Sequence, residues 1–477
     1  MKKIFYLSLF LFLIVSSRFS FSQDLADKYL KGTIDAGPDH IEIIVIVEIE
    51  KGEFVAGLYI PDQFAYNLRA SKVDFKSDSI SIIFPRLADY EGIWSDSLQG
   101  YKGFWKQGNQ SFPTDLMQIS KSDVDFLERP QIPQGPFDYI SKNIDIENIK
   151  GNSILAGTLT LPDTIGSYPL LIMVTGSGAQ NRDEEIAGHK PFLIIADYFA
   201  KNGIAVFRYD DRGFGESKGN LMTSTTEDFM TDAYAVIRYF KNYPNISSDK
   251  IGVIGHSEGG IIAMMLAAKY PKEISFIISM AGPGVPMKQL LVKQMKDISA
   301  VQGIDTETVE ILSEMQAKVL DIPEKAKNQA DLRALVTELY DEYGQKFSEE
   351  KRNEYKLNAN GINIAVMQFS NPWMKYFLTI EPEKYIKKIK CPVLAINGSK
   401  DMQVHAESNL EAIEKYLSNG KCRYFEIHKV EGLNHLFQKA ETGSLDEYFR
   451  IQHTISEDVL VLMKDFILNH PSKRVFY

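Results

Sequence analysis

The sequence has little cysteine and lacks the common cofactor motifs. Two cysteines in 477 residues are too few for a disulfide framework or a thiolate zinc site. No HExxH, GxxxxGK[ST] or complete GxGxxG pattern occurs, so we expect neither a metal nor another cofactor. Basic residues number 53 against 63 acidic residues, and the formal charge of −10 gives little electrostatic basis for binding nucleic acid.

The composition is that of a globular protein, with 44% hydrophobic and 24% charged residues. Two or three domains are expected at this length. Residues 1–22 begin with two lysines, continue with an apolar run at 4–15 and end with small residues around Phe21. This pattern predicts a secretory signal peptide and an exported, periplasmic or extracellular protein without a membrane span after cleavage. The alternative is a membrane anchor, but the apolar run is shorter than the ~20 residues of a spanning helix.

The rest of the chain changes character near residue 135. Residues 23–135 contain short apolar runs separated by Gly, Asp and Ser, which predicts a small antiparallel β-sandwich or barrel. A proline-rich segment at 130–136 is interpreted as a linker. Residues 136–477 alternate apolar runs with helical stretches, which predicts a doubly wound, mostly parallel α/β sheet. A helical insertion at about 287–384 interrupts this alternation and is predicted to form a cap over the carboxyl ends of the strands.

Residues 255–259 read Gly-His-Ser-Glu-Gly and lie between an apolar run at 251–254 and a helical stretch at 260–269. A Gly-x-Ser-x-Gly segment between a strand and a helix is the pattern of a nucleophile elbow, a sharp turn that exposes the serine hydroxyl. The N-terminus of the following helix would stabilise a developing oxyanion. We therefore predict that Ser257 is a catalytic nucleophile; the alternative is a tight structural turn.

A catalytic serine needs a histidine as base and a carboxylate that orients the histidine. In folds with such an elbow, the acid follows the serine in the chain and the histidine follows the acid. Asp401 and His435 each follow a predicted strand at its carboxyl end, in this order. His405 competes with His435, but it lies only four residues beyond Asp401 and follows the wrong strand. We predict that Ser257, Asp401 and His435 form a triad.

Backbone N–H groups of Ser177 and Glu258 are predicted to form the oxyanion hole. Ser177 lies in a glycine-rich loop after the strand at 170–174, and Glu258 follows the nucleophile. The alternative for the loop is a phosphate-binding turn. The Glu258 carboxylate either complements the helix dipole or receives a substrate ammonium group. In the charged segment at 208–217, Arg212 is interpreted as a brace between loops.

Six motifs carry a family resemblance, at residues 176–183, 188–192, 208–217, 255–260, 397–404 and 433–438. In this order they resemble two-domain bacterial carboxylesterases of the α/β-hydrolase superfamily, close to the serine aminopeptidase-like group. The resemblance implies the same triad and hydrolysis of a small-molecule ester through an acyl-enzyme. A peptidase or amidase of the same fold remains open. A catalytically silent binding protein is a third alternative, against which an intact triad argues.

Two further groups of residues have open interpretations. Phe369, Trp373 and Met374, at the end of the predicted cap, could line an apolar acyl pocket or pack the cap onto the sheet. Together they favour an uncharged acyl group. Cys391 and Cys422 each precede a predicted strand, so they could form a disulfide in an exported protein or be two small buried apolar residues. The sequence predicts no oligomeric state.

Overall fold

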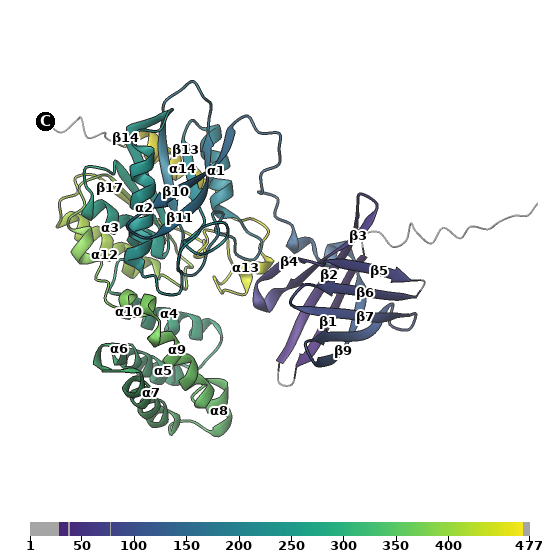
Figure 1. Ribbon diagram of the computed structural model, residues 1–477. Helices are drawn as coiled ribbons and strands as arrows, with labels where there is room; N and C mark the ends of the chain where they lie inside the picture. The colour runs from purple at the N-terminus through teal and green to yellow at the C-terminus, as the bar shows by residue number, and fades with distance from the viewer. Residues whose placement is uncertain (1–27, 37–38, 77, 471–477) are drawn as a thin grey trace, which may run out of the picture. The chain divides into compact units, whose positions relative to one another are not determined.

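The computed structural model describes residues 28–36, 39–76 and 78–470 (Figure 1). The predicted signal peptide lies outside these residues. The chain divides into two compact units, Met1–Asp125 and Phe126–Tyr477. The proline-rich segment at 130–136 belongs to the second unit. The preceding Arg129 helps to hold it there, because its Nη2 donates to the carbonyl oxygens of Ala187 (2.8 Å) and Phe449 (2.9 Å).

In the first unit, β1–β9 form an antiparallel sheet in the order β4-β3-β2-β1-β9-β8-β7-β6-β5. The edge strands β4 and β5 are consecutive in the chain. Of the two residues between them, Ala70 donates its N–H to Ala56 and Ser71 donates to Ile83, on opposite sides. The sheet therefore curls until its edges meet, around an apolar interior. The strands are β1 (Lys28–Ala36), β2 (Asp39–Glu50), β3 (Glu53–Ile60), β4 (Ala65–Arg69), β5 (Lys72–Lys76), β6 (Ser79–Phe84), β7 (Ala88–Ser95), β8 (Gly100–Gln107) and β9 (Gln110–Ile119).

The second unit contains a mixed sheet in the order β10-β11-β13-β12-β14-β15-β16-β17. β11 is antiparallel to both of its neighbours, and the remaining pairs are parallel. This is the topology of the α/β-hydrolase fold. The strands are β10 (Ile140–Asn148), β11 (Ser153–Leu161), β12 (Tyr168–Val174), β13 (Ala205–Tyr209), β14 (Ile246–His256), β15 (Phe276–Met280), β16 (Val393–Gly398) and β17 (Phe425–Val430).

Helices cover both faces of this sheet, which explains why its central strands carry mostly apolar residues where they are buried. On β12, Leu170 and Ile172 pack toward α2, α3 and α12, whereas Leu171 and Met173 pack toward α1 and α14. These helices are α1 (Pro191–Lys201), α2 (Thr226–Phe240), α3 (Glu258–Lys269), α12 (Ala406–Ser418) and α14 (Glu457–Asn469); the short α13 is Glu447–Arg450. Within the described residues, no helix combines the length and hydrophobicity that crossing a membrane requires.

The predicted cap is present between β15 and β16. Its helices gather beyond one end of the sheet (green in Figure 1) and enclose an apolar core of their own. They are α4 (Met287–Val301), α5 (Thr306–Val319), α6 (Ile322–Lys325), α7 (Gln329–Gly344), α8 (Glu349–Glu354), α9 (Ala359–Ser370) and α10 (Pro372–Phe377), followed by α11 (Glu383–Ile386).

Candidate active site

Ser257 lies at the sharp turn between β14 and α3. Its backbone has φ 54° and ψ −119°, a conformation that residues other than glycine rarely adopt. The Ser257 N–H donates to the carbonyl oxygen of Met280 at 2.8 Å, which fixes the turn against β15. A Cβ atom on Gly255 would overlap the carbonyl of Gly259, and one on Gly259 would overlap the carbonyl of Val174. The turn therefore requires both glycines, as expected for a nucleophile elbow.

His435 and Asp401 form a buried pair, with 2.7 Å between His435 Nδ1 and Asp401 Oδ2. The other oxygen, Asp401 Oδ1, accepts the backbone N–H groups of Gln403 and Val404, both at 2.8 Å. These bonds hold the carboxylate in place and make it an acceptor for His435 Nδ1–H. The Nε2 atom of His435 then carries the free lone pair that a general base needs.

A cavity of about 300 Å³ brings the predicted residues together. Ser257 and His435 line it from the sheet side, with the backbone of Gly176. Trp373 and Met374 line it from the cap and so face the same cavity as Ser257.

The corresponding prediction for Phe369 is wrong. Its side chain is 3% exposed, belongs to the apolar core of the cap and lines a different cavity. The reason is its position on α9, whose inner face packs among the other cap helices, whereas Trp373 and Met374 lie on the next helix, α10.

The loop after β12 approaches the nucleophile closely. A Cβ atom on Gly176 would lie 3.3 Å from the Ser257 Cβ, so the backbone passes directly beside the serine. Among the described residues, the N–H groups of Ser177 and Glu258 have no acceptor within the protein. Gly176 differs, because its N–H donates to Glu184 Oε1 at 2.7 Å. The two predicted oxyanion donors are thus free to bind a ligand oxygen.

The Glu258 carboxylate is 3% exposed and accepts hydrogen bonds from three side chains. Ser177 Oγ and Thr226 Oγ1 each donate at 2.7 Å, and Trp373 Nε1 donates at 2.9 Å. Burial raises the pKa of the Glu258 carboxyl, and the three hydrogen bonds oppose this rise. The carboxylate therefore joins the oxyanion loop, the start of α2 and cap helix α10, and its acceptor positions are already occupied.

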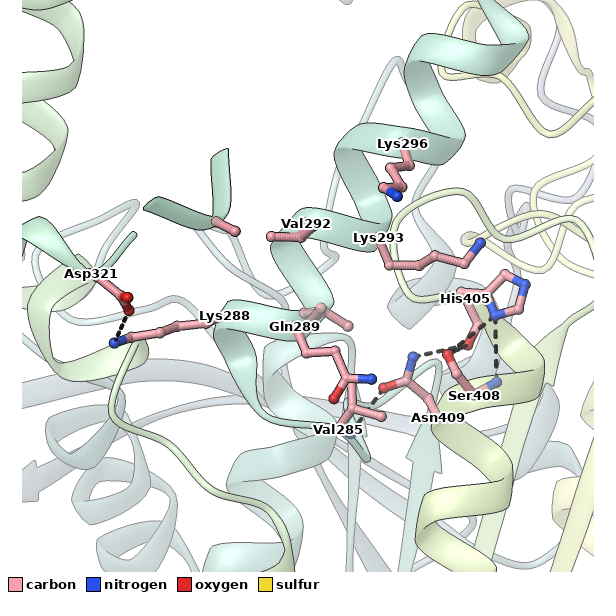
Figure 2. A pocket seen from close by; sticks show the side chains of 12 residues that line it. Val285, Lys288, Gln289, Val292, Lys293, Lys296, Asp321, His405, Ser408 and Asn409 are labelled. Atoms are coloured by element: carbon pink, nitrogen blue, oxygen red, sulfur yellow. Dashed lines mark hydrogen bonds and ion pairs between the residues drawn. The ribbon is translucent and has the colours of Figure 1, made fainter. Parts of the chain in front are cut away.

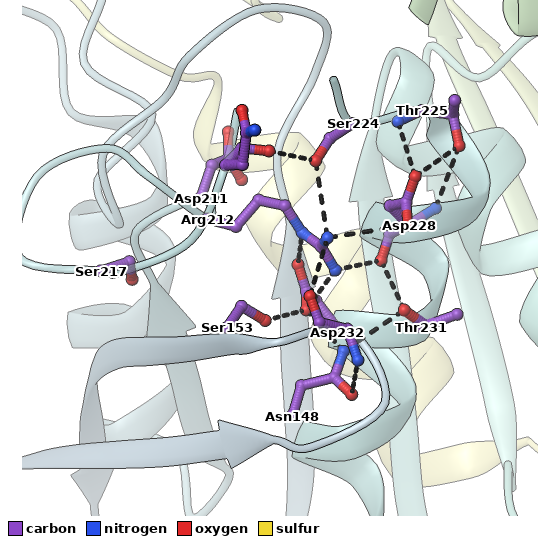
Figure 3. Close-up of polar contacts among 12 residues, drawn as sticks. Asn148, Ser153, Asp211, Arg212, Ser217, Ser224, Thr225, Asp228, Thr231 and Asp232 are labelled. Atoms are coloured by element: carbon purple, nitrogen blue, oxygen red, sulfur yellow. Dashed lines mark hydrogen bonds and ion pairs between the residues drawn. The ribbon is translucent and has the colours of Figure 1, made fainter. Parts of the chain in front are cut away.

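Arg212 braces the loop after β13, as the sequence predicts (Figure 3). Its Nε lies 2.6 Å from Asp232 Oδ2 and its Nη2 lies 2.8 Å from Asp232 Oδ1, and both side chains are buried. Asp232 Oδ1 also accepts from Asn148 Nδ2 and Ser153 Oγ, both at 2.7 Å. The charged motif thus ties this loop to α2 and to the β10–β11 hairpin.

His405 is not placed to act as the base. It lies in a second cavity of about 540 Å³, beside Lys293 and Ser408 (Figure 2). Its side chain accepts the N–H of Ser408 and so caps the start of α12. Helix capping accounts for this histidine, and His435 rather than His405 lines the cavity with Ser257.

The disulfide hypothesis is wrong, because both cysteines are free. The thiol of Cys422 instead donates to the backbone carbonyl oxygen of Cys391, with 3.2 Å between sulfur and oxygen. Burial raises the pKa of the Cys422 thiol. Cys391 is buried and Cys422 is half-buried, and they lie just before β16 and β17. No cluster of three or more metal-binding side chains occurs in the described part of the chain.

Glu184 and Thr226 also contact the site, and neither is predicted from the sequence. They reach it from a loop and a helix start, 73 and 31 positions before Ser257 in the chain. No spacing rule connects residues at such separations, so only the fold reveals them.

Comparisons with known proteins find relatives of this chain in sequence and in structure. Esterase EstD of Thermotoga maritima is 26% identical over 306 residues, which cover 63% of this chain and 62% of EstD. Thiohydrolase aneE of Aspergillus aculeatus is 32% identical over 128 residues, 26% of this chain and 36% of aneE. Among solved structures, the match to Est1E of Butyrivibrio proteoclasticus with bound ferulic acid covers 68% of this chain and 98% of the Est1E chain, at 19% identity and a TM-score of 0.39. The match to Pyrococcus furiosus esterase Pf2001 covers 72% of this chain and 97% of the Pf2001 chain, at 16% identity and a TM-score of 0.43.

The chain thus spans somewhat less than two thirds of the length of EstD. The model of the X-Pro dipeptidyl-peptidase (S15) family matches residues 151–430. This range covers more than half of the chain and runs from β11 to the end of β17. It includes the turn at Ser257, the cap and the loop that carries Asp401. The protein belongs to the X-Pro dipeptidyl-peptidase (S15) family of α/β-hydrolases.

Proposed function

We propose that the protein is an exported carboxylesterase with Ser257 as its nucleophile. Ser257 Oγ attacks the ester carbonyl, and His435 Nε2 accepts its proton and returns it to the leaving alkoxide. Asp401 keeps the imidazole in the required tautomer and stabilises its positive charge. The N–H groups of Ser177 and Glu258 stabilise the oxyanion. Water then hydrolyses the acyl-enzyme. Export rests on the N-terminal sequence alone.

The observation that carries this proposal is the shared cavity. It holds a serine in a strained elbow, an imidazole whose Nδ1 is fixed by a carboxylate, and two N–H groups without acceptors. These are the parts that acyl transfer requires, and they come from four different strand ends of one sheet, those of β12, β14, β16 and β17. A binding protein has no need for a base with an unpartnered Nε2 beside a strained serine.

The name of the family raises a second candidate, a peptidase that recognises a free amino terminus. Such a substrate needs a carboxylate that faces the cavity with free acceptor positions. Glu258 is occupied by three donors, and the charge of Glu184 faces the ring of His256. Trp373 and Met374 add apolar surface. These contacts favour an uncharged acyl group.

The test compares p-nitrophenyl butyrate with the p-nitrophenyl ester of 2-aminobutyrate, which have the same carbon skeleton and leaving group. Each kcat/KM is divided by the uncatalysed hydrolysis rate, because an ammonium group activates its own ester. We expect a preference of at least about tenfold for butyrate, equivalent to about 1.4 kcal/mol in transition-state binding, and no cleavage of Gly-Pro p-nitroanilide. A tenfold preference for the free-amino ester would overturn the esterase assignment.

A further inference from the structure

A second histidine–carboxylate pair lies beside the proposed triad, and both of its residues line the same cavity. His256, the residue before the nucleophile, is 4% exposed and Glu184 is 1% exposed. His256 Nδ1 lies 3.0 Å from Glu184 Oε1, and His256 Nε2 lies 2.9 Å from the backbone carbonyl oxygen of His435. The rings of His256 and His435 are 4.6 Å apart between centroids.

The partners of His256 determine where its protons are. A backbone carbonyl oxygen only accepts hydrogen bonds, so Nε2 must carry a proton to bind His435. Glu184 Oε1 already accepts the N–H of Gly176 at 2.7 Å, and as a carboxylate oxygen it also accepts from His256 Nδ1. Both ring nitrogens are then donors, and an imidazole with two N–H groups is a cation.

The surroundings support this charge. Burial alone would lower the pKa of His256, but the Glu184 carboxylate, the hydrogen bond to the His435 carbonyl and the charge of Asp401 together outweigh burial and raise the pKa above its ordinary value of 6.5. The titratable groups that face the ring are Glu184, Asp401 and His435, and the Asp401 carboxylate adds to the rise. With Glu184 ionised, the pair is neutral overall, so it does not oppose the positive charge that His435 gains during acyl transfer.

We propose that the Glu184–His256 ion pair positions the catalytic machinery by joining the loop of His435 to the oxyanion loop at Gly176. His256 binds the backbone carbonyl oxygen of His435, and Glu184 binds the N–H of Gly176, the residue before Ser177. The pair touches no reacting atom, so both members are positioning residues. This inference rests on the proposed esterase function.

The pair should add a protonation of its own to the pH profile of the enzyme. His256 must be charged to keep both of its bonds. Once it loses the Nδ1 proton, that nitrogen faces the carboxylate with a lone pair, the bridge opens and activity falls at alkaline pH.

The kinetic test uses Glu184→Gln, which keeps the size and one acceptor oxygen but removes the counter-charge. We expect kcat/KM for p-nitrophenyl butyrate to fall roughly 10²-fold at the pH optimum, the loss typical of misplaced catalytic groups, with the alkaline limb moved to lower pH by about one unit or more. His189→Gln is the matched control, because His189 also binds a backbone carbonyl, that of Tyr448 at 2.8 Å, away from the site. Its pH profile should equal that of the wild type.

A spectroscopic test does not depend on activity. In protein labelled with ¹⁵N-histidine, His256 should carry protons on both nitrogens at pH 7.5, and its signals should vanish in His256→Gln. His189 serves as a neutral reference. A neutral His256, or a Glu184→Gln variant with the wild-type rate and profile, would overturn the inference. If a fluorophosphonate fails to label Ser257 while His256 is cationic, the proposed function fails and the ion pair stands.

Discussion

Removing the Glu258 carboxylate should destabilise the protein far more than neutralising it. Glu258→Ala leaves three donors without their acceptor, from the buried Thr226, the half-buried Trp373 and the solvent-exposed Ser177. An unsatisfied donor costs about 1–3 kcal/mol. Cavity water and the loss of a desolvated charge offset part of that sum. We therefore expect Glu258→Ala to lower the free energy of unfolding by roughly 2–4 kcal/mol.

Glu258→Gln is the matched variant, because it keeps the shape and one oxygen. The hydroxyl groups of Ser177 and Thr226 can accept as well as donate, so either can bind the new amide N–H₂. Only the Trp373 indole must keep an oxygen, and the amide oxygen supplies it. The cost should stay within about 1 kcal/mol, with kcat/KM for uncharged esters near the wild-type value.

Urea unfolding followed by circular dichroism gives the free energies, and Trp373→Phe completes a double-mutant cycle with Glu258→Ala. The two losses should not add, because they share one hydrogen bond. A Glu258→Gln variant as unstable as Glu258→Ala would refute the hydrogen-bond account. A selective loss of activity on free-amino esters would instead identify Glu258 as an ammonium receptor.

Three further outcomes concern stability and thiols. Burial and, to a smaller extent, the charge of Arg129 lower the pKa of His189 from 6.5 to about 3. The contribution of neutral His189 to the free energy of unfolding is therefore fully present above pH 6.5 and is lost as the pH falls toward 3. Between pH 7 and 5 the wild type should lose about 2 kcal/mol more than His189→Gln in urea unfolding; equal losses would contradict this pKa. Arg212→Met should cost about 3–5 kcal/mol by stranding Asp232, and adding Asp232→Asn should restore part of this loss, because the amide is uncharged and keeps an acceptor oxygen for Asn148 and Ser153; no restoration would refute the brace. Unfolded, unreduced protein should react as two free thiols, whereas none would indicate a disulfide.

The elements that carry the triad are predictable because the central strands are buried on both faces. β12, β15, β16 and the part of β14 at 251–254 read as short apolar runs, and α1 to α3 start within a few residues of the predicted stretches. The elbow follows from its two glycines, and Asp401 and His435 follow from their places after strands. These elements can be predicted because residues that are neighbours in the chain determine their conformation.

Other parts depend on contacts that a linear pattern does not contain. β10 and β11 are not predicted, because polar residues such as Asn143 and Thr158 interrupt them and pair only across the hairpin. The inward turn of Phe369 depends on how the cap helices pack. The roles of Glu184 and Glu258 depend on donors that lie far from them in the chain, such as His256 for Glu184 and Ser177 for Glu258. The sequence around a carboxylate does not show which donors will bind it.

The most direct test of the account is covalent labelling of the nucleophile. A fluorophosphonate probe, followed by peptide mass spectrometry, should modify wild-type protein once, on the peptide that contains Ser257. His435→Ala should label much more slowly. Ser257→Ala should not label, and its kcat for p-nitrophenyl butyrate should fall by about 10⁶-fold with the fold intact. A label on another residue, or a Ser257→Ala variant that keeps more than about one hundredth of wild-type turnover, would show that this serine is not the nucleophile.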